Sequence, residues 1–203
     1  CTKATDVYMH DFPSDAIGKA IPYGVYDVQH NEGFVYLGQS ADTAEFAVEA
    51  IVAWWQQMGS KHFQGTTDIF FLADSGGSNG YRLRLWKQQL QAKLADALGL
   101  TVTVAHYPRG ASKWNPIEHR CFSQISQTWA GTPLNSFDVA LDAILNTTTT
   151  TGLHIEAMRT EKQYAKGIKI TDAEMASLSL QPHAVCPQRN YTIRPRTCGV
   201  ISG

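Results

Sequence analysis

Apolar and polar residues alternate in an early stretch of the chain. Residues 23–38, YGVYDVQHNEGFVYLG, place β-branched and aromatic side chains on both sides of HNEG. This alternation predicts a β-hairpin in which Gly33 supplies the positive φ of the turn. The domain is therefore expected to have two antiparallel strands before its first helix.

Further along, apolar residues recur every three or four positions, which is typical of helices with one buried face. The first such segment has Asp42 as its predicted N-cap and ends at Gly59. The third begins with Asn115 as cap and Pro116 at the first helical position. The three predicted helices occupy residues 41–59, 81–99 and 115–129.

Short apolar runs separate these helices. DIFFLAD (68–74) is continuous enough to predict a strand covered on both faces, and LTVTVAH (100–106) predicts another. The order hairpin, helix, strand, helix, strand, helix predicts an α/β fold with a mixed sheet flanked by helices. We expect the core to occupy residues 1–131, and residues 132–203 to form a small, mostly helical extension with an extended tail.

Composition narrows the class of protein. The 203 residues are 43% hydrophobic, which suits one well-buried globular domain. No run approaches the roughly 18 apolar residues of a membrane span, and no signal peptide is visible, so a cytoplasmic location is expected. The four cysteines contain no C-x-x-C pair, which argues against a structural zinc site and favours free thiols.

Charge is unevenly distributed. Residues 1–60 hold 2 basic and 8 acidic residues, whereas residues 61–203 hold 15 basic and 10 acidic ones. The later part therefore has a net positive charge, which permits a polyanionic partner there.

Asp74 is the first candidate for chemistry, because it ends an apolar strand and precedes the flexible sequence SGGSNG. Ligands of α/β sheets gather beyond the carboxyl ends of strands. The alternative is a structural cap of the following turn. The glycines match neither a dinucleotide-binding nor a phosphate-loop pattern. Ser75 also permits a hydrolase interpretation, although the Asp-x-x-His sequence that ends at His30 precedes this serine rather than following it.

Glu118 is the second candidate. It lies in the first turn of the helix that follows strand 100–106, so it is expected near the same rim as Asp74. A capping box with Asn115 is the structural alternative. The surrounding sequence RGASKWNPIEHR also contains Arg109, Lys113 and Arg120, which suit contacts with a phosphate backbone. Two carboxylates from separate elements are ligands for hard divalent ions, a pattern typical of metal-dependent nucleotidyl transfer.

Several long motifs resemble one known family. LADSGGSNGYRLRLWK, HYPRGASKWNPIEHRCFSQIS and NYTIRPR, with HDFPSDAIGKAIPYGVYDV, are similar to the Rhodopirellula-type group of bacterial DDE transposases over nearly the whole chain. The resemblance implies a ribonuclease H-like core, Mg²⁺ or Mn²⁺ bound by three acidic residues, and double-stranded DNA as the partner, at transposon ends and target. It also implies action at the bacterial nucleoid and a homo-oligomer in the active complex. Asp74 and Glu118 match the second and third acids.

The first acid has no clear counterpart in the chain. A ribonuclease H-like core begins with three antiparallel strands, the first of which carries that Asp, but only two strands are predicted before the first helix. We therefore expect the first strand and its Asp to precede Cys1, which would make this chain a truncated transposase, inactive alone. Asp27 is kept as a minority candidate for the first acid. The rival hypotheses are a catalytically inactive, DNA-binding relic of a transposase and an unrelated α/β hydrolase that uses Ser75.

Overall fold

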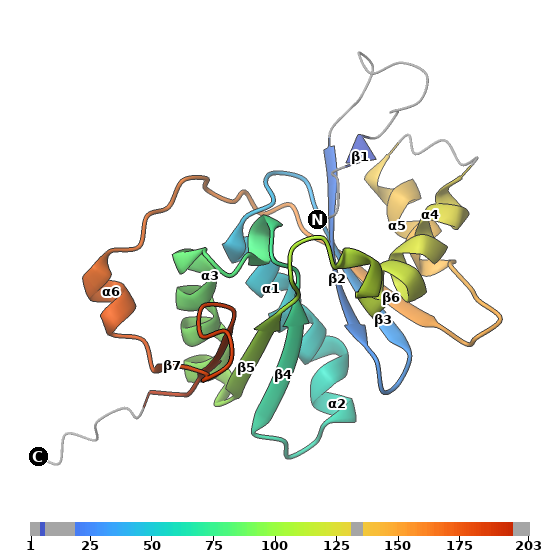
Figure 1. Cartoon of the computed structure of the whole chain (residues 1–203). Coiled ribbons are helices and arrows are strands. Elements are labelled where there is room, and N and C mark those ends of the chain that lie inside the picture. Colours follow the sequence, from blue (N-terminus) through green and yellow to red (C-terminus); the bar gives the residue numbers. More distant parts are fainter. Residues whose placement is uncertain (1–4, 7–18, 131–135, 197–203) are drawn as a thin grey trace, which may run out of the picture.

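The computed structural model describes residues 5–6, 19–130 and 136–196. They form two four-stranded mixed sheets with helices on their faces (Figure 1). The strands are β1 (Thr5–Asp6), β2 (Lys19–Asp27), β3 (Glu32–Gly38), β4 (Asp68–Ala73), β5 (Thr101–His106), β6 (His154–Arg159), β7 (Leu180–Pro182) and β8 (Asn190–Ile193). The predicted mixed α/β architecture is confirmed.

The first sheet has the order β1-β2-β3-β6. β2 and β3 form the predicted hairpin, with Tyr23 opposite Tyr36, and β6 pairs with β3 in parallel. The second sheet has the order β4-β5-β8-β7, in which β4 and β5 are parallel and β8 is antiparallel to β5. Ala73 lies opposite His106, so β4 and β5 end side by side.

Helix α1 (Ala44–Trp54) packs against β2 and β3, and it also contacts helix α3 (Arg84–Gln89) (Figure 1). It continues through a π-helical segment (Trp55–Gly59) into α2 (Ser60–His62). α3 continues into a second π-helical segment (Leu90–Asp96). α5 (Phe137–Leu145) packs on β6, and α6 (Asp172–Ala176) lies near α3.

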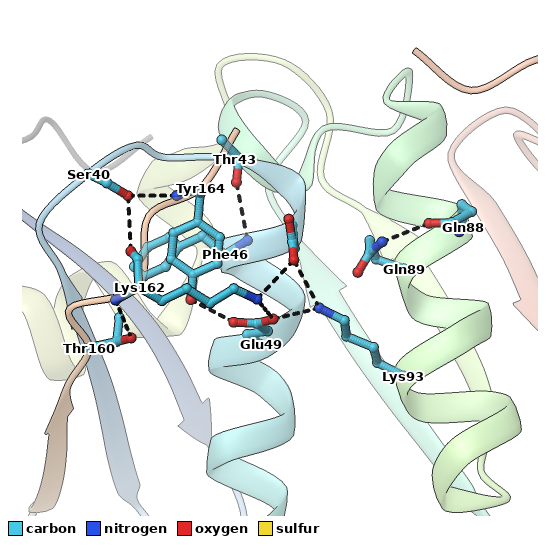
Figure 2. A network of polar contacts seen from close by, with 11 residues as sticks. Ser40, Thr43, Phe46, Glu49, Gln88, Gln89, Lys93, Thr160, Lys162 and Tyr164 are labelled. Atoms are coloured by element: carbon cyan, nitrogen blue, oxygen red, sulfur yellow. Dashed lines mark hydrogen bonds and ion pairs between the residues drawn. The ribbon is translucent and has the colours of Figure 1, made fainter. Parts of the chain in front are cut away.

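A polar network ties the segment after β6 to α1 (Figure 2). Glu49 Oε1 accepts from Lys93 Nζ at 2.6 Å and from Lys162 Nζ at 2.5 Å, and Glu49 Oε2 accepts from the Tyr164 hydroxyl at 2.6 Å. Burial acts to raise the pKa of Glu49, but the three donors lower it below its ordinary value. Glu45 Oε1 also accepts from Lys93 and Lys162, so the network joins α1, the π-helical segment Leu90–Asp96 and the segment after β6.

Two local expectations are wrong. Asn31, with φ 57°, takes the left-handed position of the hairpin turn instead of Gly33. Gly33 is required for another reason, because a Cβ there would lie 2.8 Å from Cys121 Sγ. Thr43, rather than Asp42, caps α1 by accepting from the Phe46 amide at 3.2 Å.

The prediction that β4 is covered on both faces is also wrong. Phe70 is 60% exposed and Leu72 is 50% exposed, whereas Phe71 on the opposite face contacts Trp54. Helices therefore cover only one face of this strand. In addition, the first predicted helix does not end at Gly59, since it continues to His62.

The segment after residue 131 contributes strands as well as helices. α5 and α6 are helices within the extension that was predicted to be mostly helical. The same extension also contains β6, which pairs with β3, and β8, which pairs with β5. The predicted tail NYTIRPR begins with β8, which is fully integrated into the second sheet. The domain boundary at residue 131 stays a prediction. Strands from before and after this residue pair within the same sheets.

Candidate active site

Asp74 lies directly after β4, at the carboxyl end that β4 shares with β5. Its Oδ1 accepts from Asn115 Nδ2 at 3.3 Å. The neighbouring Tyr107 amide donates to the Ala73 carbonyl at 2.9 Å, and the Ser75 hydroxyl donates to the Tyr107 carbonyl. The loops after the two strands are thereby fastened together around the Asp74 carboxylate.

Glu118 begins a π-helical segment (Glu118–Phe122) that leads into α4 (Ser123–Trp129). Its amide donates to the Asn115 carbonyl at 3.1 Å, while the Asn115 side chain reaches Asp74. Asn115 is 8% exposed, so it connects the two candidate acids from a buried position. The sequence predicted only a capping role for Asn115. Its position three residues before Glu118, in the sequence NPIE, was the one sign that it could also support the candidate site.

Asp74 and Glu118 line one cavity of about 500 Å³. Residues of β2 and β4 form its sides, and apolar residues of α1 and α3, among them Trp54 and Trp86, also line it. The structure therefore brings the two predicted acids to the same cavity, although they come from different elements. Oxygen donors at the end of an apolar cavity suit a hard cation such as Mg²⁺.

The negative charge of Asp74 acts on nearby phenols. Burial is the main cause that raises the pKa of Tyr23 above its ordinary value, and the carboxylates of Asp42 and Asp74 add to it. Burial and Asp74 likewise raise the pKa of Tyr107. Both tyrosines therefore stay protonated at neutral pH, and the carboxylate end of the cavity carries a negative potential that favours a cation.

Asp27 also lines the cavity, but its carboxylate has local partners. Its Oδ1 accepts from the Gln29 amide at 2.8 Å and the His30 amide at 3.2 Å, and its Oδ2 contacts His30 Nδ1 at 2.7 Å. These contacts are those of a turn cap. They favour the structural interpretation of Asp27 over the role of first acid.

An open channel separates the two sheets. β2 has no partner strand along Ile21–Asp27 on the side away from β3, and β4 has none on the side away from β5, within the residues described. Both free edges line the cavity that holds Asp74 and Glu118. Unpaired strand edges are templates for another strand.

The predicted DNA-contacting residues Arg109, Lys113 and Arg120 are exposed, on the segment that leads to Glu118 and just beyond it. Lys113 Nζ lies 5.1 Å from the ring centroid of Trp114, whose side chain is 69% exposed. Within the described residues, none of the three cations forms an ion pair with a carboxylate. Their charges are available to a polyanion beside the cavity.

Ser75 does not have the surroundings of a nucleophile. Its hydroxyl donates to a backbone carbonyl, and both ring nitrogens of the strand-end histidine, His106, contact the carbonyls of Asn79 and Arg189. His30 is held by Asp27 instead. These contacts give no support to the hydrolase interpretation.

No group of three or more metal-ligating side chains occurs among the residues that the structure covers. The two carboxylates and the buried Asn115 fit part of a divalent-ion site, because hard ions take oxygen ligands and require further donors. Over the same residues, no helix is both long and apolar enough to span a bilayer.

The two mixed sheets and the helices that flank them are consistent with the ribonuclease H-like fold of the DDE class. The chain belongs to the family described as the Rhodopirellula transposase DDE domain, whose model matches residues 1–195. No curated protein and no solved structure matches the chain significantly.

Proposed function

We propose that the chain is the catalytic domain of an insertion-sequence transposase, which cuts and joins DNA at transposon ends by nucleotidyl transfer. Asp74 and Glu118 would hold Mg²⁺ or Mn²⁺. The observation that carries the proposal is that these two acids line one cavity and are connected through Asn115. When bound, such ions activate the attacking oxygen and stabilise the leaving oxygen of a phosphodiester.

The acid set would be completed by a strand in the open channel between β2 and β4. A strand there would pair with both free edges and join the two sheets into one. An acidic residue on this strand would reach the cavity that already contains Asp74 and Glu118. If the first strand of a ribonuclease H-like core takes this position, it supplies the first acid, and the metal site is incomplete without it.

The partner in this proposal is double-stranded DNA. Support comes from the family and from the exposed cations Arg109, Lys113 and Arg120 beside the cavity. Transposon ends and target must be held together, so a homo-oligomer is expected in the active complex. Action on chromosomal DNA would place the protein in the bacterial cytoplasm, at the nucleoid.

A DNA-binding relic without catalysis is the alternative, favoured by the absence of a third metal-ligating side chain beside Asp74 and Glu118 in the described residues. Calorimetric titration with Mn²⁺ separates the two. The proposal predicts weak binding by the present chain and at least a tenfold loss of affinity for Asp74→Asn or Glu118→Gln. A relic would give the same isotherm for all three proteins.

Asp68→Asn is the matched control, because Asp68 lines the same cavity at the other end of β4 and accepts from Thr67 Oγ1 at 2.7 Å. It should retain the Mn²⁺ affinity of the unchanged chain. A second measurement uses a chain extended by the residues that precede Cys1 in its gene. Extension should raise the Mn²⁺ affinity and allow nicking of a transposon-end duplex, and both gains should vanish with Asp74→Asn.

A further inference from the structure

A cluster of cations surrounds Tyr81, in the loop between Asp74 and α3. The Cζ atoms of Arg82 and Arg189 each lie 5.3 Å from the centroid of the Tyr81 ring. Tyr81 is 5% exposed, so the two guanidinium groups lie against a fixed aromatic platform. Burial acts to raise the pKa of the Tyr81 phenol, but hydrogen bonds from Arg189 and Arg82 and the charge of Arg109 lower it.

His106 holds this cluster in place. Its Nδ1 contacts the Arg189 carbonyl at 2.8 Å, and its Nε2 contacts the Asn79 carbonyl at 2.9 Å. The loop before β8 and the loop after β4 are thereby fastened to the end of β5. Asn79 also donates from Nδ2 to the Tyr23 hydroxyl at 3.3 Å, which links the cluster to the cavity of the candidate acids.

A further cation extends the cluster along α3. Lys87 Nζ lies 5.2 Å from the centroid of the Tyr191 ring, and the charges of Lys87 and Arg189 both act on His106. Four cations from three separate segments therefore act on Tyr81, Tyr191 or His106 near the carboxyl end of β5. They are Arg82, Lys87, Arg109 and Arg189.

These cations lack carboxylate partners, in contrast to the structural arginines of the same chain. Arg84 pairs with Asp172, Arg159 with Asp138 and Glu161, and Arg196 with Asp96. No carboxylate forms an ion pair with any of the four cations in the part of the chain that the structure describes. Like charges held together without counter-ions are costly in the free protein and favour an anion.

We propose that Arg82 and Arg189, held against the Tyr81 ring, form together with the nearby Arg109 a clamp for backbone phosphates of DNA. The guanidinium fork matches phosphate geometry, and rigid placement on a buried ring reduces the entropy cost of binding. The proposal rests on the function proposed above, because the clamp is linked through Asn79 and Tyr23 to the cavity that Asp74 lines, and it would position the strand whose phosphodiester reaches the acids. Sequence reasoning missed Arg82 and Arg189, since they are far apart in the chain and only the fold joins them.

The test is a fluorescence anisotropy titration of the 203-residue chain with a labelled duplex of transposon-end sequence, in EDTA and at several NaCl concentrations. The double variant Arg82→Gln, Arg189→Gln should bind about tenfold or more weakly. The slope of log K against log salt should fall by about one for each phosphate that the variant no longer neutralises. The control protein carries Arg159→Gln and Arg196→Gln together: this removes the same two charges from arginines that are paired with carboxylates, and should change neither quantity.

Thermal unfolding of each variant checks folding. Should the double variant unfold, Arg109→Gln supplies the same test, because Arg109 is exposed and makes no contact with the Tyr81 ring within cation–π range. A folded double variant with unchanged affinity and salt slope would overturn the clamp, as would an unchanged Arg109→Gln variant if the double variant does not fold.

Two further measurements are needed. One distinguishes the DNA clamp from a site for free phosphate, and the other distinguishes the clamp from the candidate metal site. Inorganic phosphate at matched ionic strength should displace DNA no better than chloride does. Stronger displacement that the double variant lacks would assign the site to free phosphate and overturn the DNA clamp. Asp74→Asn should bind DNA in EDTA as well as the unchanged chain does, so failure of the metal site and failure of the clamp give different results.

Discussion

The side-chain nitrogen of Asn115 lies 3.3 Å from Oδ1 of Asp74, across the gap between the end of β4 and the helix that carries Glu118. This contact fixes the direction of one candidate acid from the element that supplies the other. In metal sites, hydrogen-bond partners of this kind orient the ligands, and their loss weakens metal affinity substantially.

Asn115→Ala should therefore weaken Mn²⁺ binding by about 10-fold or more, because Asp74 loses the donor that orients it. Calorimetric titration measures the effect, and circular dichroism should show an unchanged fold. Asn146→Ala removes a comparable bond, from Asn146 Nδ2 to the Asp142 carbonyl at 2.8 Å, on an exposed helix end. Equal effects of the two substitutions would contradict the orienting role of Asn115.

His106 should make stability depend on pH. Burial lowers the pKa of His106 below its ordinary value of 6.5, and Lys87 and Arg189 add to the effect, although the two carbonyl contacts oppose it. The unfolded chain then binds the proton more readily than the folded one below about pH 6.5. The free energy of unfolding should thus reach its full value above that pH and decrease as the pH falls.

Urea denaturation between about pH 5 and 8 measures this dependence. His106→Gln should flatten the curve in the acidic range, and should cost about 1–3 kcal/mol near neutral pH because the hydrogen bond that the neutral imidazole donates to a carbonyl is removed. His154→Gln, at a side chain that is 61% exposed, is the control for replacing a histidine by glutamine. A curve of unchanged shape for His106→Gln would show that another group titrates.

Glu49→Gln should destabilise the fold by about 1–3 kcal/mol, because Lys93 and Lys162 lose their shorter carboxylate contacts and keep only those to Glu45, at 3.5 and 3.0 Å. The pKa of Glu49 is lowered in the folded state, so its contribution is present above the ordinary value of 4.5 and is lost as the pH falls through the folded value. The difference between the two proteins should consequently shrink toward acidic pH. A difference that stays constant down to about pH 3 would contradict the assignment.

Gly33→Ala should destabilise the protein by about 1–3 kcal/mol, since the new Cβ would lie 2.8 Å from Cys121 Sγ. Combining it with Cys121→Ala should recover part of the loss relative to the sum of the single variants, because the second change removes the sulfur. Gly76→Ala meets no atom within 4 Å and has no positive φ, so it serves as the neutral control. Strict additivity of the two changes would exclude a steric cause.

The Cys121 thiol itself stays protonated near neutral pH, because burial and the charge of Glu118 raise its pKa to about 12.

The sequence was sufficient for elements whose pattern is local. The hairpin, β4, β5 and the helix that begins after Asn115 follow from periodicity and capping residues, and the placement of Asp74 at a strand end follows from them. The local pattern did not predict which residues are buried where burial depends on the packing of distant elements. The run DIFFLAD has the composition of a fully covered strand, but Phe70 and Leu72 are exposed to solvent among the residues described.

Long-range pairings were equally hidden. β6 has the mixed polar sequence HIEAMR, and only its parallel register with β3 explains why Ile155 is buried. The approach of Arg82 and Arg189 to Tyr81 depends on the antiparallel pairing of β8 with β5. No spacing rule connects these residues, so their cluster had no signal in the sequence.

The parallel pairing of β3 with β6 also bears on how the chain acquires its structure. Glu32 lies opposite His154, so this part of the first sheet cannot form until most of the chain is available. The second sheet waits longer, because β8 supplies the partner of β5 between residues 190 and 193. Contacts so distant in sequence slow folding. A ribosome-bound chain would therefore leave these edges of β3 and β5 unpaired until residues 154–159 and 190–193 are made.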